Sequence, residues 1–457
     1  MGNPPWVAYS HLSAKLKTWL RDASSQMNLW VGGRLATQQD LSALFWARCA
    51  QRYLKRGGVI AFVLPYAALN RPAFAGLRRG DYRDVAVRIT AAWSFDEKVQ
   101  PLFPVPACVL IARRDESGPP PSEVTRSAGS LPRRDATEEE AAKALTWHPE
   151  PWPPIPTLAG ASPYRARFQD GATIYPRRFF IVEREAAGRL GHNPAAPRVR
   201  GKIGGQDKAP WRDVEPPHGP IEREFLRPVV LGETIAPFRL LTPVLGVVPI
   251  AGKEIMDAAA AAEAGFRHLA AWLRDAEAKW GAHAARGVDG TLRMTLLERV
   301  NHMRGLSAQI GVIKSRLVYA KAGTLFAATV LEDHLAIVDH MAYWAPLRAV
   351  EEGRYLSAIL NCDAVRRRIA PMQPKGQGGA RHFDNLIWEL PIPEFDRRDA
   401  LHAKLAAAAA EAERVAAAVP LDEGTHFTRQ RRAIRDALIA SGIGARIDAL
   451  VARLLGP

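Results

Sequence analysis

Cysteine is scarce in this chain of 457 residues, which contains only three. Cys49, Cys108 and Cys362 are far apart and form no Cys-x-x-Cys pair, so the pattern excludes a disulfide framework and gives no indication of a zinc site. We expect them to be small core residues of a reduced protein. The sequence also shows no signal peptide and no apolar run of bilayer-spanning length, which predicts a cytoplasmic protein without a membrane partner.

Acidic residues are outnumbered, because 47 Asp and Glu stand against 62 Lys and Arg and give a formal net charge of +15. This excess favours a polyanionic partner such as nucleic acid, although a composition rich in Ala and Arg can produce the same excess without one. The length allows two or three domains with cores of their own. The lone pair Asp339-His340 has no third ligand at suitable spacing, so we expect no metal site and no catalytic role there.

The run Asn3-Pro4-Pro5-Trp6 carries the strongest chemical signal of the sequence. An exocyclic amine conjugated to a base is a poor nucleophile, so a site that methylates it must accept hydrogen bonds from the NH2 group. The Asn3 side-chain carbonyl is one acceptor, and Pro4, which has no N–H, presents a backbone carbonyl as the second. Trp6 offers a flat face to a base extruded from a duplex. The alternative is an ordinary turn, since Asn-Pro-Pro is also a turn signal.

The residues after this motif have the order of an α/β domain. Residues 40–56 show the apolar spacing of a helix that stops at Gly57-Gly58, and 59–64 (VIAFVL) reads as a strand buried on both faces of a mostly parallel sheet. Residues 85–95 and 107–112 are also strand-like. Together with the motif, residues 1–115 resemble the catalytic half of the amino-group DNA methyltransferases. More narrowly, they are similar to the adenine-N6 enzymes of restriction-modification and phage-defence systems.

The resemblance implies a partial doubly wound, Rossmann-like methyltransferase domain with S-adenosylmethionine as the cofactor. It assigns catalytic roles to Asn3, Pro4, Pro5 and Trp6. It also implies that Phe103 packs against the flipped base, with a phenylalanine that packs in the core or anchors a loop as the more frequent alternative. In the family the Gly-rich cofactor loop precedes the Asn-Pro-Pro motif, and no glycine cluster of this sequence follows a strand and opens a helix. The sequence therefore predicts a chain that is inactive alone. An N-terminal methyltransferase half, on a longer chain or a partner, would complete it, unless the chain is a remnant.

Composition divides the rest of the chain into three parts. Residues 116–163 are predicted to be a Pro-rich linker with one short helix near 138–145, residues 164–395 a mixed α+β target recognition domain, and residues 396–457 a helical tail. Within the recognition domain the patterns predict short strands at 229–231 and 240–250, helices at 255–280, 292–310 and 355–369, a hairpin at 316–330, and a strand that ends in the LPIP run at 390–393.

Two groups of residues are candidates for contact with double-stranded DNA. Arg177, Arg178, Arg200 and Lys202 suit phosphate contact, with a solvated basic loop as the alternative for each. The second group lies around a Gly-rich loop between a helix and the LPIP run, an order that resembles the end of recognition domains in type I specificity subunits. Its candidate base-reading residues are Lys375, Gln377, Arg381 and His382.

The function that this combination favours is the catalytic-motif and recognition part of a site-specific DNA adenine-N6 methyltransferase, with possible restriction or defence subunits as partners. A non-catalytic, specificity-type DNA-binding subunit or remnant is the alternative. An enzyme that methylates protein glutamine shares the Asn-Pro-Pro-aromatic motif, but it needs no large basic module after the catalytic half.

Overall fold

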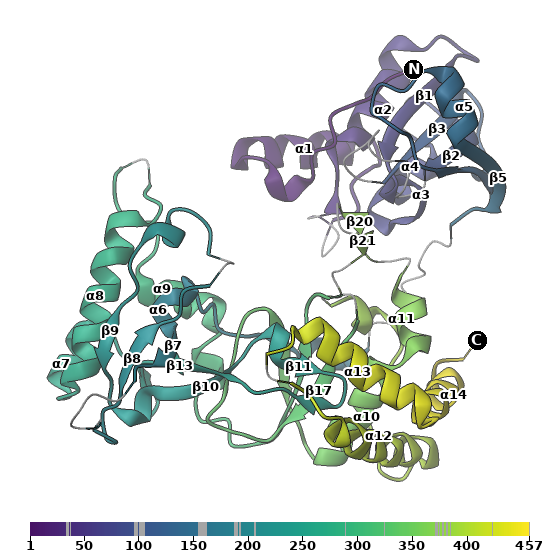
Figure 1. Ribbon diagram of the computed structural model, residues 1–457. Coiled ribbons are helices and arrows are strands. Elements are labelled where there is room, and N and C mark those ends of the chain that lie inside the picture. Colours follow the sequence, from purple (N-terminus) through teal and green to yellow (C-terminus); the bar gives the residue numbers. More distant parts are fainter. Residues whose placement is uncertain are drawn as a thin grey trace. The chain divides into compact units, whose positions relative to one another are not determined.

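The chain forms two units, each with its own sheets and core (Figure 1). By their internal contacts, the first unit is Met1–Leu158 with Arg367–His382, and the second is Ala159–Arg366 with Phe383–Pro457. The computed structural model describes residues 1–457 except 33–35, 37, 96–98, 100–105, 154–161, 187–190, 192, 205–206, 288, 324, 371–372, 374, 377–378, 381–382, 384, 423 and 457. The side chains of residues 375, 376, 379 and 380 are likewise outside the description.

A five-stranded sheet forms the centre of the first unit, in the order β1-β3-β2-β4-β5. Its strands are β1 (Val59–Pro65), β2 (Val87–Phe95), β3 (Ala107–Arg114), β4 (Glu123–Gly129) and β5 (Leu145–Pro151). Only β2 and β4 pair in parallel; the other pairs of neighbours are antiparallel. The expectation of a mostly parallel sheet therefore needs correction, and β1 is not buried on both faces, since Val59 is 51% exposed. An apolar run in the sequence indicates that a strand is buried, but it does not indicate whether the neighbouring strand is parallel or antiparallel.

Helices pack around this sheet: α1 (Ala14–Gln26), α2 (Leu41–Tyr53), α3 (Ala67–Asn70) and α4 (Ala75–Arg79). The helix predicted at 40–56 is confirmed as α2. The Asp40 side chain caps its first turn by accepting a 2.9 Å hydrogen bond from the Ser42 backbone N–H. The cap, the apolar spacing and the following glycines are all local, which is why the sequence was sufficient to predict this helix.

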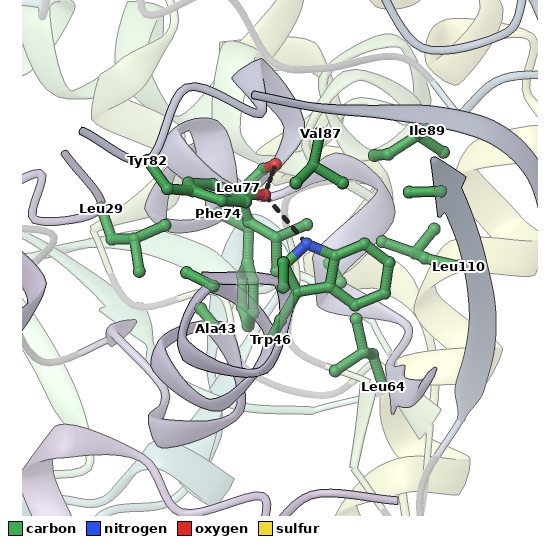
Figure 2. Close-up of a cluster of buried hydrophobic side chains, with 14 of the residues drawn as sticks. Leu29, Ala43, Trp46, Leu64, Phe74, Leu77, Tyr82, Val87, Ile89 and Leu110 are labelled. Carbon is green, nitrogen blue, oxygen red and sulfur yellow. Dashed lines mark hydrogen bonds between the residues drawn. The ribbon is translucent and has the colours of Figure 1, made fainter. Parts of the chain in front are cut away.

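The core of the first unit centres on Trp46 of α2 (Figure 2). The Trp46 indole N–H donates to the Tyr82 hydroxyl at 2.9 Å, and the Tyr82 hydroxyl donates to the Leu77 carbonyl at 2.6 Å. Burial raises the pKa of Tyr82, so its hydroxyl remains protonated and able to donate. The Trp46 indole N–H, the Tyr82 hydroxyl and the Leu77 carbonyl are therefore all hydrogen-bonded inside the core. Leu64 and Leu110 of the sheet lie near the indole ring.

The predicted linker at 116–163 is largely ordered structure of the first unit. The strands β4 and β5 extend the sheet, and α5 (Glu138–Ala144) lies between them, where the sequence predicted a short helix. A capping box joins Thr137 and Glu140 at the start of α5. After β5, the Trp152 indole N–H donates to the Leu69 carbonyl at 2.9 Å. The edge strand β5 buries few side chains, so its polar, proline-containing sequence looked like a linker.

The second unit contains a six-stranded sheet, β18-β10-β13-β7-β8-β9, and a four-stranded sheet, β17-β16-β19-β6. The first sheet consists of β7 (Ile181–Arg184), β8 (Arg198–Gly201), β9 (His218–Pro220), β10 (Leu226–Val230), β13 (Val244–Val247) and β18 (Ile337–Val338). The second consists of β6 (Gln169–Asp170), β16 (Arg316–Ala320), β17 (Ala328–Leu331) and β19 (Ala342–Pro346). Two small pairs join β11 (Ile235–Ala236) to β12 (Arg239–Leu240) and β14 (Ile250–Ala251) to β15 (Glu254–Ile255). The predicted hairpin at 316–330 is confirmed as β16 and β17.

Two of the helices predicted for this unit are shorter than expected. Besides α6 (Arg177–Phe180), the structure has α7 (Ala258–Glu263) and α8 (Arg267–His283) in place of one helix, because Gly265 between them has φ +85°. The helix predicted at 292–310 is reduced to α9 (Leu296–Val300). Beyond it the chain turns at Met303 with φ 52°, a backbone conformation that no α-helix contains.

The remaining helices are α10 (Val350–Asn361), α11 (Asp363–Ile369), α12 (Ala400–Ala418), α13 (Phe427–Ala440) and α14 (Ile443–Leu455). The helix α12 packs on α10, and α14 packs on α12, so the predicted helical tail is part of the core of the second unit. The strand predicted before the LPIP run is wrong, because Leu386–Glu389 forms a 3-10 turn. None of the described helices combines the length and apolar character that a membrane crossing requires.

Candidate functional site

The Asn3-Pro4-Pro5-Trp6 motif directly follows Gly2, the residue that pairs with β1 of the five-stranded sheet. The Gly2 N–H donates to the Ala61 carbonyl at 2.9 Å, and the Val63 N–H donates to the Gly2 carbonyl at 2.9 Å, so Gly2 lies parallel to β1. A Cβ atom on Gly2 would lie 2.6 Å from the Phe62 ring, which explains the need for glycine at this close approach. Asn3 therefore lies beyond this bridge in the direction of the carboxyl end of β1.

The four motif residues differ in exposure in a way that suits their predicted roles. Pro4 is buried and Trp6 is half-buried, while Asn3 and Pro5 are exposed. The Trp6 indole N–H donates to the Val63 carbonyl at 3.2 Å. Within the described residues, no donor bonds to the Asn3 side chain or to the Pro4 carbonyl. Both residues lie in a segment without regular secondary structure, residues 3–7, which follows the pairing of Gly2 with β1.

The segment after the motif is fastened to the start of α2. The Leu41 N–H donates to the Val7 carbonyl at 3.0 Å, and the Tyr9 N–H donates to the Gln39 carbonyl at 2.8 Å. Gln39 is buried, and its amide donates to the Ala73 carbonyl at 3.0 Å. Sequence reasoning missed Gln39, because a polar residue in a loop gives no sign that it will be buried. These contacts hold both ends of the motif.

Several of the predicted residues cannot be placed. Phe103, Gln377, Arg381 and His382 lie outside the described residues. Lys375 is described by its backbone alone, in β20 (Lys375–Gly376), which pairs antiparallel with β21 (Gly379–Ala380). Their predicted roles in base stacking and base reading stay predictions.

The structure corrects the prediction for Arg178. Its side chain is buried, and its guanidinium donates to the Asp207 carboxylate at 3.0 Å and to the Val214 carbonyl. Contact with a phosphate would require this enclosed ion pair to open, which would leave the buried Asp207 carboxylate without its partner at a high cost. Arg178 therefore holds the second unit together. Its neighbour Arg177 points elsewhere because successive residues of α6 face different sides.

The other three basic candidates reach the surface. Arg200 on β8 is exposed and forms an ion pair with Glu215. Lys202, just after β8, is exposed and lines a cavity of about 610 Å³. Arg177 lines a second cavity of about 420 Å³ and forms ion pairs with Glu233 at 3.7 Å and Asp339 at 3.8 Å. The two cavities adjoin, since Glu233 and Phe427 line both.

The Asp339-His340 pair also borders the second cavity. Asp339 is fully buried, and its carboxylate accepts hydrogen bonds from His340 Nδ1 and from the Met341 backbone N–H, both at 2.9 Å. Among the described residues, no group of three or more His, Cys, Asp and Glu side chains is arranged to hold a metal ion. The pair was expected to have no metal role, and sequence reasoning did not connect it with Arg177 because 161 residues lie between Arg177 and Asp339 in the chain.

No protein-family model and no curated protein matches the sequence. Among solved structures, the chain is similar to the Type IIL restriction-modification enzyme MmeI in complex with DNA, with a TM-score of 0.57 and 12% identity over 100% of this chain. It spans about half of MmeI, 54% of that chain. Matches with lower scores, which carry no argument here, include a nuclease-deletion mutant of the Type ISP enzyme LlaGI with a DNA substrate mimic (TM-score 0.41, 10% identity, 93% of this chain and 36% of that one) and the DrdV-DNA complex (0.40, 11%, 94% and 46%).

The likeness to MmeI concerns the fold. This chain has the mixed α/β architecture of that enzyme over the whole length compared, at a sequence identity too low to transfer activity residue by residue.

Proposed function

We propose that this chain is the catalytic-motif and DNA-recognition part of a site-specific DNA adenine-N6 methyltransferase of the restriction-modification type. The observation that carries the proposal is the position of Asn3 and Pro4. Both residues follow Gly2, which pairs in parallel with β1, and among the described residues neither the Asn3 side chain nor the Pro4 carbonyl accepts a hydrogen bond. The fold of the chain is similar to that of a restriction-modification enzyme. In this proposal the second unit binds double-stranded DNA.

The chemistry assigned to the motif is recognition of an amine. Asn3 Oδ1 and the Pro4 carbonyl each accept one hydrogen bond from the adenine N6 amine, which draws the nitrogen toward a tetrahedral, nucleophilic geometry. Trp6 provides the face on which the extruded base stacks, and its bond to the Val63 carbonyl fixes the orientation of that face. Pro5 has no N–H, so no backbone donor competes for the acceptors.

The described residues do not supply a cradle for S-adenosylmethionine. Gly32 and Gly204 lie outside the described helices and strands, and neither directly joins a described strand to an α-helix as a dinucleotide-type loop does. We therefore assign cofactor binding to a methyltransferase half outside this sequence, on a longer chain or on a partner, and place no step of the reaction on the cofactor here.

The proposal is tested by transfer of a labelled methyl group to duplex DNA in the complete, active assembly. Asn3→Ala removes one acceptor and is expected to lower the rate at least about a hundredfold, the range for loss of one preorganised hydrogen-bonding group. The matched control is Asn193→Ala, an exposed asparagine of the second unit, which is expected to leave the rate unchanged. Unchanged methylation by the Asn3 variant would remove the catalytic assignment.

A second candidate is a specificity-type subunit that binds DNA without methylating it. The missing cofactor cradle favours it. Such a subunit would bind duplex DNA with a steep inverse dependence on salt, yet the complete assembly would transfer no methyl group. The same assay therefore distinguishes the two candidates.

A further inference from the structure

Five separate segments of the second unit converge on the cavity of about 420 Å³. Arg177 comes from the start of α6, Lys208 from the loop after β8, Glu233 from the turn after β10, His340 from the link between β18 and β19, and Phe427 from the start of α13. Side chains far apart in sequence thus place donors, an acceptor and an aromatic ring around one space.

Residues 339–341, two of which line this cavity, form the junction between the two sheets of the second unit. β18 belongs to the six-stranded sheet and β19 to the four-stranded sheet, so the link connects the two. Its backbone is fixed by the Asp339 N–H, which donates to the Val230 carbonyl at 2.9 Å, and by the His340 N–H, which donates to the Ala172 carbonyl at 2.8 Å. The buried Asp339 carboxylate in turn orients the His340 ring. A site on such a rigid support is preorganised for recognition.

Arg177 is held at this junction between two carboxylates. The distances of its guanidinium to Glu233 (3.7 Å) and to Asp339 (3.8 Å) are longer than hydrogen bonds, so these two contacts orient the group by charge. Glu233 is half-buried and borders the cavity itself. An arginine fork and a carboxylate acceptor therefore stand next to each other.

The Arg177 donors and the Glu233 acceptor together favour a ligand that has both acceptors and a donor. Lys208 and Arg431 also line the cavity, so charge alone does not exclude a phosphate. A phosphate has only acceptor oxygens, however, and would leave the Glu233 carboxylate without a donor. A base-pair edge offers acceptors and a donor together. In the major groove, arginine matches guanine O6 and N7, and a carboxylate accepts from the cytosine N4 amine.

We propose that this cavity reads the major-groove edge of one G·C pair of duplex DNA. Arg177 donates to guanine O6 and N7, and Glu233 accepts from cytosine N4. Asp339 is a positioning residue that acts through Arg177 and His340. The inference rests on the proposed function, since it names the residues by which the second unit recognises its target.

The experiment is selection from a library of randomised DNA duplexes by the full chain, wild type and variants. The selected motif of the wild type is expected to contain a G·C pair that Arg177→Lys and Glu233→Gln no longer require. Discrimination at that pair should fall roughly tenfold to a hundredfold. Lysine keeps the positive charge but lacks the planar fork, so total affinity in moderate salt should change little. The matched control is Arg198→Ala, which breaks an exposed Arg–Glu pair on β8 and should leave the motif unchanged.

Thermal unfolding of each variant is measured first, and a variant that unfolds at the wild-type temperature enters the selection. If the wild type selects a motif and both folded variants select the same motif with the same discrimination, the inference is overturned while the proposed function stands. If the wild type shows no preference among sequences, the recognition role of the second unit fails, and the inference fails with it.

Discussion

The indole nitrogen of Trp6 donates a hydrogen bond to the backbone carbonyl of Val63 at 3.2 Å. Val63 also donates its N–H to Gly2, so the residues on both sides of Asn3-Pro4-Pro5 are bound to the same residue of β1. The segment that contains Asn3 and Pro4 is therefore held at its beginning and its end. Such a clamp would supply the preorganisation that the proposed recognition of an amine requires.

Trp6 variants separate this clamp from base stacking. Trp6→Ala removes both and is expected to lower kcat/KM for methylation roughly tenfold to a hundredfold, since stacking on an aromatic ring contributes about 1–3 kcal/mol per base. Trp6→Phe keeps a ring face without the hydrogen bond, so its loss should be smaller. Steady-state kinetics of the complete assembly measure both. Trp19→Ala, at an exposed position on α1, is the control. Equal losses for Ala and Phe would show that the clamp, and not the ring, matters.

Tyr82 is predicted to be important for the stability of the first unit. Tyr82→Phe leaves the Trp46 indole N–H buried without an acceptor and the Leu77 carbonyl without this donor. The expected cost is about 1–3 kcal/mol in the free energy of unfolding, which denaturant titration can measure. Tyr53→Phe, at a site that is 80% exposed, should change little. Equal stability of the two variants would contradict the importance of this chain of hydrogen bonds.

Stability of the second unit should depend on pH through Glu352. Burial raises the pKa of Glu352, but hydrogen bonds from Arg167, the Arg348 N–H and Tyr164 outweigh burial and hold the pKa below its usual 4.5. A carboxyl with a lowered pKa stabilises the fold above 4.5, and this contribution is lost as pH falls through the lowered value. Unfolding followed from pH 7 to pH 3 should show that loss.

The variant Glu352→Gln tests the same group directly. It leaves Arg167 without its carboxylate and should cost about 3–5 kcal/mol at pH 7, with a flatter dependence on acid pH. The neighbour Glu351 pairs with Arg397 in an exposed position, so Glu351→Gln is the control and should cost little. A Glu352 variant with the acid dependence of the wild type would contradict the assignment.

Lys202 is predicted to contact phosphate without reading sequence. Lys202→Ala should weaken binding to every duplex alike and make the slope of log affinity against log salt shallower by about one. The control is Lys253→Ala, an exposed lysine in the turn between β14 and β15. Binding titrations at several salt concentrations measure the slopes. An unchanged slope for the Lys202 variant would place it outside the DNA interface.

The elements predicted correctly are those whose signals are local. α2 has its cap, its apolar spacing and its terminal glycines within 19 residues, and α5 has a capping box. The hairpin of β16 and β17 is likewise adjacent in sequence. In contrast, the direction of the neighbour of β1 depends on β3, whose pairing the apolar run of β1 does not encode.

In the candidate sites, too, some properties follow from the sequence alone and others depend on the fold. The hydrogen-bonding capacity of Asn3 and Pro4 follows from residue type alone, while their catalytic role stays a prediction. The roles of Arg177 and Arg178 could not be predicted, because adjacent arginines have the same sequence signal. Only the fold shows that Arg178 is enclosed with Asp207 while Arg177 faces Glu233 in a cavity.

The most direct measurement is a map of N6-methyladenine in the DNA of cells that produce the complete protein, with wild-type Asn3 or with Asn3→Ala. The account predicts that the wild type modifies adenine within one defined sequence motif and that the variant leaves this motif unmodified while the protein is present at the same level. Wild-type DNA without methylated adenine, or an Asn3→Ala map identical to that of the wild type, would contradict it.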